Sequence, residues 1–197
     1  MTDKGLEIIM RWEGLPPKNP LDAYWDKNGK VWTIGYGATH YPDGSPVKKG
    51  DKLKSKDEAI ELLRKLVKTY EKYVDHYVKS QINPYQRDAL SIFTYNLGPK
   101  HLEESTLLKK VNANPDDPTI RDAFAAWNKV KNPVTSQYEV SRGLANRRKA
   151  EADLYFTEWQ EPLPEYNSTD PRGPYYPSQD DDKDNVSWMY QYHSEHE

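Results

Sequence analysis

The chain has 197 residues, which suits one domain of ordinary size with an appendage. Charged residues make up 30% of it and apolar residues 36%, a balance that excludes a collagen-like, a wholly disordered or a membrane-spanning chain. Cysteine is absent, so disulfides and thiolate ligands are excluded, and the five histidines lack the spacing of a metal-binding helix. We therefore expect neither a metal nor a cofactor.

The net charge of −3 is divided unevenly along the chain. Residues 1–156 hold 26 basic against 21 acidic side chains, whereas residues 157–197 hold 2 against 10. A mildly basic body suits an anionic partner such as a bacterial envelope. Lysine and arginine are scattered rather than gathered in a stripe with aromatic residues, so nucleic acid is not an expected partner.

The first half of the body mixes helix and strand. Helical spacing of apolar residues predicts a helix over 4–13, which Gly14 ends. Tyr24 and Trp25, an Asn28–Gly29 turn and residues 31–37 then predict a β-hairpin. We expect this to be the one convincing sheet of the chain.

The rest of the body is predicted to be helical. Ser55 is a suitable N-cap for an apolar stripe of period 3.6 over 56–79, about 36 Å long and enough to join two lobes. Pro84 begins a helix that Gly98 ends, and further helices are expected near 101–113, 118–130 and 141–157. From 158, closely spaced prolines and a run of aspartates predict an extended or disordered acidic appendage.

Two acidic residues are candidates for catalysis. Glu13 stands at a helix end beside Trp12, where partial burial would suit a general acid, although such a residue by itself is more often a surface group. Asp26 comes 13 residues later and enters the turn, which it could simply serve to form. Hydrolysis of a glycosidic bond needs one protonated and one ionised carboxyl group. The hydroxyl of Thr33 could hold a water molecule or a sugar, or the residue could be there for its β-propensity.

Five stretches, taken in order, resemble the phage-type lysozymes of glycoside hydrolase family 24. They are Glu13-Gly14, residues 23–26 (AYWD), 32–39 (WTIGYGAT), 86–98 with 105–108, and Trp127 with 143–151 (GLANRRKAE). The resemblance implies an α+β, lysozyme-like fold, in which the helix over 56–79 joins a small antiparallel sheet lobe to a larger helical lobe. The catalytic domain would span 1–157 and the appendage 158–197, with the cleft between the two lobes.

The resemblance also implies roles for individual residues. Glu13 would protonate the leaving oxygen, Asp26 would activate or position the attacking water, and Thr33 would hold that water on the opposite face of the sugar. The reaction would be hydrolysis, with inversion, of the β-1,4 bond from N-acetylmuramic acid to N-acetylglucosamine.

Further residues are expected to bind the substrate. By resemblance, Asn96 would line the saccharide cleft, and Arg147 or Arg148 would lie near Glu13. Glycines on both sides of Tyr36 could let a polymeric ligand approach the backbone closely, so Tyr36 is expected at the substrate, as is Arg147.

The chain departs from the family pattern in one spacing. Twelve residues separate Glu13 from Asp26, where the family has about eight. Asp22 has the usual spacing and is therefore a rival for the second carboxylate. Asp26 is preferred because it follows a Tyr-x-Asp pattern and precedes the turn into Thr33.

Three functions remain open from the sequence. The first is a monomeric phage endolysin acting on bacterial peptidoglycan. With no signal peptide and no segment for membrane insertion, it would stay in the host cytoplasm until released to the cell wall. The second is a virion-associated or effector lysozyme that uses the appendage for docking. The third is a wall-binding module that has lost catalysis. Whether the product is hydrolysed or a cyclic anhydro-sugar is also open.

Overall fold

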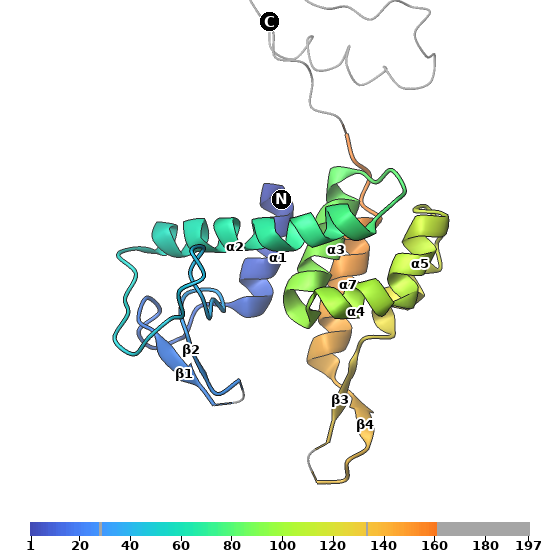
Figure 1. The fold of residues 1–197 in the computed structure, drawn as a ribbon. Helices are drawn as coiled ribbons and strands as arrows, with labels where there is room; N and C mark the ends of the chain where they lie inside the picture. Colours follow the sequence, from blue (N-terminus) through green and yellow to red (C-terminus); the bar gives the residue numbers. More distant parts are fainter. Residues whose placement is uncertain (28, 133, 161–197) are drawn as a thin grey trace, which may run out of the picture. The chain divides into compact units, whose positions relative to one another are not determined.

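Helices dominate the protein, which we describe from a computed structural model covering residues 1–27, 29–132 and 134–160 (Figure 1). Residues 1–159 form one unit, and the predicted appendage lies outside the described residues from position 161 onward. The elements in chain order are α1 (Asp3–Glu13), β1 (Tyr24–Asp26), β2 (Val31–Thr33), α2 (Lys56–Tyr77), α3 (Pro84–Leu97), α4 (Pro99–Glu104), α5 (Thr106–Ala113), α6 (Ile120–Ala125), β3 (Lys129–Lys131), β4 (Tyr138–Val140) and α7 (Arg142–Tyr155).

The predicted first hairpin is confirmed. Strands β1 and β2 pair antiparallel, with Tyr24 opposite Thr33 and Asp26 opposite Val31. The second strand is shorter than predicted, because the chain turns back after Thr33. There the backbone groups of Ile34 and Ala38 bond each other in both directions, at 2.8 and 3.0 Å.

Helix α2 runs from above the first hairpin to α3, so it joins the sheet lobe to the helical lobe as predicted (Figure 1). Ser55 caps it by accepting a hydrogen bond from the Glu58 backbone at 3.1 Å, and the helix ends at Tyr77, two residues before the predicted end. At its near end, Ala59 and Leu63 are buried in the same core as the sheet-lobe residue Ile34.

Helix α3 is the centre of the helical lobe and packs against α1, α2 and α7. Its start is fixed by a capping box, in which Asn83 and Gln86 each accept a hydrogen bond from the other's backbone N–H at 2.9 Å. Buried side chains occur all round the helix, from Ala89 to the Phe93 ring, which meets the rings of Phe124 and Trp127. Helix α3 is therefore held by contacts on several sides.

The predicted helix over 101–113 is wrong in one respect, because it is broken at Ser105. The Ser105 hydroxyl accepts a hydrogen bond from the Leu108 backbone at 2.9 Å and so begins α5 as an N-cap. The predicted helix over 118–130 is also too long, since α6 ends at Ala125. The last helix matches its prediction closely, starting after Ser141 and ending at Tyr155.

A second hairpin corrects the expectation of a single sheet. Strands β3 and β4 pair antiparallel, with Lys129 opposite Val140 and Lys131 opposite Tyr138. The Asn132 side chain accepts hydrogen bonds from the Val134 and Thr135 backbones at 2.8 and 3.1 Å, which builds the turn. Both faces of this hairpin are exposed, so the hydrophobic alternation that would have signalled strands is too weak to see in the sequence.

Candidate active site

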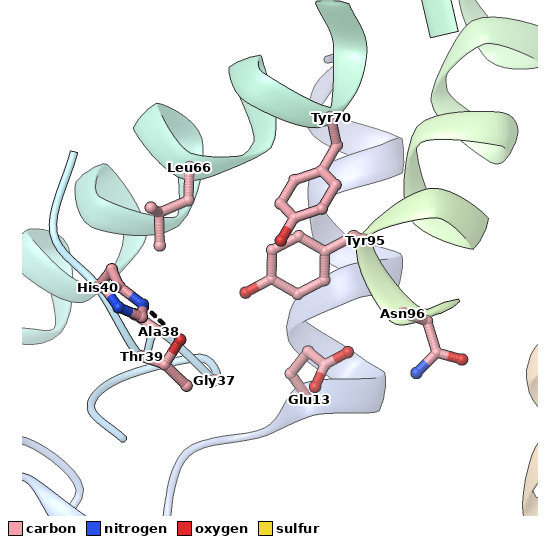
Figure 2. A pocket seen from close by; sticks show the side chains of 9 residues that line it. All are labelled: Glu13, Gly37, Ala38, Thr39, His40, Leu66, Tyr70, Tyr95 and Asn96. Atoms are coloured by element: carbon pink, nitrogen blue, oxygen red, sulfur yellow. Dashed lines mark hydrogen bonds between the residues drawn. The ribbon is translucent and has the colours of Figure 1, made fainter. Parts of the chain in front are cut away.

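A cavity of about 240 Å³ lies where the end of α1 meets the segment after β2 and the facing sides of α2 and α3 (Figure 2). It is lined by Glu13, Gly37, Ala38, Thr39, His40, Leu66, Tyr70, Tyr95 and Asn96. Figure 2 shows Glu13 below the ring of Tyr95, with Thr39 and His40 on one side and Asn96 on the other. The cavity therefore has one carboxyl group at its floor and aromatic and amide groups around it.

Glu13 is the last residue of α1, and its side chain is 22% exposed. Arg147 on α7 holds it, with 2.8 Å between Arg147 Nη2 and Glu13 Oε1. The contact is an ion pair that lacks hydrogen-bond alignment. A carboxylate at the C-terminal end of a helix meets the negative end of the helix dipole, and the guanidinium of Arg147 offsets that repulsion. The predicted general acid thus lies at the cavity, with a fixed cation behind it.

Gly37 lets the segment after β2 lie against Glu13. Its φ of +89° is a conformation that glycine adopts without strain. A Cβ atom at this position would lie 3.4 Å from Glu13 Oε2 and 3.7 Å from the Tyr95 hydroxyl. A methyl group would therefore be in ordinary contact with both atoms, and it is the positive φ that favours glycine here.

Two tyrosines form the wall above Glu13. The rings of Tyr70 and Tyr95 meet edge to face at 5.0 Å, and Tyr95 donates a hydrogen bond to the Tyr36 carbonyl oxygen at 2.9 Å. Burial raises the pKa of both phenols, and the negative charge of Glu13 adds to the increase. Both phenols therefore stay protonated at neutral pH.

Three polar residues share one face of the first hairpin. Tyr24 and Asp26 alternate along β1 and so share a face, and Thr33 joins that face because it is paired with Tyr24. Burial raises the pKa of Tyr24, and the charges of Asp26 and Glu13 raise it further. The charges of both carboxylates thus act on the Tyr24 phenol.

Asp26 and Asp22 differ in their surroundings. The Asp22 carboxylate is tied to Lys52 by an ion pair of 3.0 Å, and it does not contribute to the pKa shift of Tyr24. The Asp26 carboxylate turns over the hairpin loop, where a Cβ atom on Gly29 would lie 2.8 Å from Asp26 Oδ2. Asp26 thus lies in β1, on the face that includes Tyr24, whereas Asp22 precedes the strand and is paired with Lys52.

The remaining predicted site residues are distributed as follows. Asn96 lines the cavity, and Thr33 is 4% exposed, with an Oγ1 atom that has no hydrogen-bond partner among the described residues. Arg147 touches Glu13, whereas Arg148 lies deeper and donates to Asn96 Oδ1 at 2.7 Å. The Tyr36 side chain is 5% exposed in the core. Of the predicted site residues, Glu13 and Asn96 line the cavity, whereas Asp26, Thr33, Tyr36 and Arg147 are not among its lining residues.

Sequence reasoning gave no role to several residues at the site. Tyr95 stands next to Asn96 in one of the matched stretches, but a tyrosine within a helix gives no local sign that it will reach a cavity. His40 lines the cavity and contacts Thr39 Oγ1 through Nδ1 at 3.0 Å (Figure 2). Within residues 1–27, 29–132 and 134–160, no cluster of three imidazole or acidic side chains could hold a metal ion.

A helical lobe and a small sheet lobe with a carboxyl group in the cavity between them define a lysozyme-like protein, and comparison with known proteins agrees. Residues 10–151 match the family model described as phage lysozyme. An endolysin of Acyrthosiphon pisum secondary endosymbiont phage 1 is 32% identical over 155 residues, which cover 79% of this chain and 97% of that protein.

Solved structures give the same result. The endolysin from Escherichia coli O157:H7 phage FAHEc1 has a TM-score of 0.68 at 35% identity, covering 79% of this chain and 92% of the other. The muramidase domain of SpmX from Asticaccaulis excentricus has a TM-score of 0.67 at 26% identity, with coverages of 80% and 97%. The chain belongs to the phage lysozyme family. Among the described residues, none of the helices combines the length and apolarity needed to cross a bilayer.

Proposed function

We propose that the protein is an endolysin: a glycosidase of the muramidase type that hydrolyses bacterial peptidoglycan between N-acetylmuramic acid and N-acetylglucosamine. The observation that carries the proposal is Glu13, a carboxyl group at the floor of a cavity with Arg147 fixed behind it. Membership of the phage lysozyme family supports the same reaction. We propose that it acts as a monomer.

In this proposal Glu13 is the general acid that protonates the leaving oxygen. Tyr95 is the other acidic group at the floor, but its hydroxyl proton is used in the hydrogen bond to the Tyr36 carbonyl, and its pKa is raised. Tyr95 is therefore a poor proton donor, which leaves Glu13 as the acid in this proposal. Arg147 holds the carboxyl group in one orientation, which keeps the transferred proton aimed at the substrate.

Asp26 and Thr33 handle the water in the same proposal. Both lie on the hairpin face that includes Tyr24. The Thr33 hydroxyl is buried without a hydrogen-bond partner among the described residues, so a bound water molecule would satisfy it as donor and acceptor. Asp26, ionised, takes a proton from that water as it attacks the anomeric carbon from the side opposite the leaving oxygen. An attack from that side inverts the anomeric configuration.

The experiment compares three variants in clearing a peptidoglycan suspension. Glu13→Gln and Asp26→Asn are expected to slow the reaction by about 10²–10⁴-fold, the usual contribution of a general acid or base. Asp22→Asn is the matched control, since it removes a carboxylate only four residues away, and it should keep wild-type activity. Circular dichroism checks that each variant is folded.

Product analysis completes the test. Mass spectrometry of the digest reports which bond is cut and separates hydrolysed from anhydro products, and early NMR spectra report the configuration of the new anomeric carbon. A folded Glu13→Gln variant that clears the wall at the normal rate would exclude Glu13 as the acid. Tight binding of the wild-type protein without new reducing ends would instead indicate a wall-binding module.

We propose further that the protein acts on the cell wall after release from the host cytoplasm, as expected of an endolysin. This part of the proposal draws on the relatives named as endolysins.

A further inference from the structure

Three charged residues of α7 are buried behind the cavity. Arg147, Arg148 and Glu151 fall at helical spacings that put them on one side of the helix, and Arg148 and Glu151 have no exposed surface in their side chains. Glu151 Oε1 accepts hydrogen bonds from Arg147 Nε at 3.3 Å and from Arg148 Nη2 at 2.8 Å. One carboxylate oxygen thus holds both guanidinium groups.

The two arginines lead from this carboxylate to two residues that line the cavity. Arg147 pairs with Glu13, the last residue of α1, at 2.8 Å. Arg148 donates to Asn96, near the end of α3, at 2.7 Å, and its guanidinium lies over the Phe93 ring at 5.1 Å. The chain of contacts therefore runs from one cavity residue to the other and passes through Glu151.

The buried charges of this cluster are not an efficient way to stabilise the fold. Glu151 Oε2 and Arg148 Nε and Nη1 are buried without a hydrogen-bond partner among the described residues. Buried ion clusters with unsatisfied atoms cost desolvation energy, and apolar side chains of similar volume often serve as well or better. A role in stability alone does not account for these charges, whereas a role in holding the cavity residues does.

We propose that Glu151 is a positioning residue of the active site, which holds Arg147 against Glu13 and Arg148 against Asn96. The inference rests on the proposed function of Glu13 and goes beyond it, since Glu151 does not line the cavity. Two cavity residues from different helices are thereby fixed relative to each other through one buried charge.

The charge on Glu151 also makes this positioning of Arg147 and Arg148 depend on pH. Burial raises the pKa of Glu151 to about 7, against the opposing effect of Arg148 and Arg147 on the same helix, while Glu13 from α1 adds to the increase. Asn96, from α3, does not titrate. Ionised Glu151 holds the arginines strongly and protonated Glu151 holds them weakly, so Glu151→Gln mimics the protonated form.

The test compares wild type, Glu151→Gln and the control Asp153→Asn between pH 5 and pH 9. Asp153 is a carboxylate of the same helix, but it is exposed and pairs with Lys149 and Arg121. At pH 8 the Glu151→Gln variant should lose about tenfold in kcat with KM nearly unchanged, and the loss should fade as pH falls below 7. The control should follow the wild type throughout.

A second readout does not depend on activity. In NMR, the Arg147 Nε–H proton should exchange slowly with water in the wild type and in the control. In Glu151→Gln it should exchange quickly. If that variant does not fold, the double variant Arg148→Met, Glu151→Met replaces the ion pair by apolar side chains. It should be at least as stable as the wild type, yet its kcat should be about tenfold lower.

The possible results separate the two proposals. A folded Glu151 variant with wild-type kcat and pH profile would overturn the role of Glu151, as would a loss of thermal stability with unchanged kcat per folded molecule. A wild-type protein that releases no sugar ends would overturn the proposed function, while the Arg147 signal would still report whether Glu151 holds that arginine.

Discussion

Glu151 should make the free energy of unfolding depend on pH in the sense opposite to that of an ordinary acidic residue. Its pKa rises from an ordinary 4.5 to about 7, because burial outweighs the two neighbouring arginines. Between these pH values the unfolded chain has lost a proton that the folded chain keeps. The free energy of unfolding therefore falls as pH rises through this window, and Glu151→Gln removes the effect.

The size of the effect follows from the two pKa values. Each pH unit between them is worth about 1.4 kcal/mol, so the whole window contributes about 3 kcal/mol. Urea denaturation followed by tryptophan fluorescence, at intervals from pH 4 to pH 8, measures it. The difference in unfolding free energy between wild type and Glu151→Gln should fall by about 3 kcal/mol from pH 4.5 to pH 7 and stay level above.

Asp153→Asn is the control with the opposite sign. A hydrogen bond from Lys149 lowers the pKa of Asp153, so its stabilisation is present above its ordinary value of 3.8 and is lost as pH falls below it. Across pH 4.5 to 7 the wild type and this variant should therefore differ by a constant amount. If the Glu151→Gln difference is also constant, or grows with pH, the carboxyl group of Glu151 does not titrate there and the reasoning fails.

Three further changes test the fold and the site. Gly37→Ala puts a side chain at φ +89° beside Glu13, so it should cost about 1–2 kcal/mol in stability and slow wall clearing more than any fall in folded fraction explains. Arg87→Met removes one of the two cations on the buried Glu71 carboxylate and leaves the N-terminal ammonium of Met1 as the other, so urea denaturation should show a loss of about 2 kcal/mol, with activity per folded molecule retained. Phe93→Ala empties a fully buried site and should lower the unfolding free energy by about 4 kcal/mol. A loss below 1 kcal/mol for either of the last two would contradict the packing described.

The sequence predicted most of the helices because their ends are decided locally. Ser55, and Asn83 with Gln86, satisfy the first free N–H groups of their helices through side chains only a few residues away. The break at Ser105 was missed although the same chemistry causes it, because an apolar pattern continues across it. The hairpin at 129–140 was missed because it buries neither face.

At the site, the sequence alone determined which chemical groups are available: Glu13 at a helix end, Asp26 before a turn and a pair of arginines on the last helix. Only the tertiary structure decided their partners. Arg147 rather than Arg148 meets Glu13, Asp22 is paired with Lys52, and Tyr36 points into the core. The reason is physical, since caps and turns act over a few residues, whereas each of these contacts depends on how whole helices and strands pack.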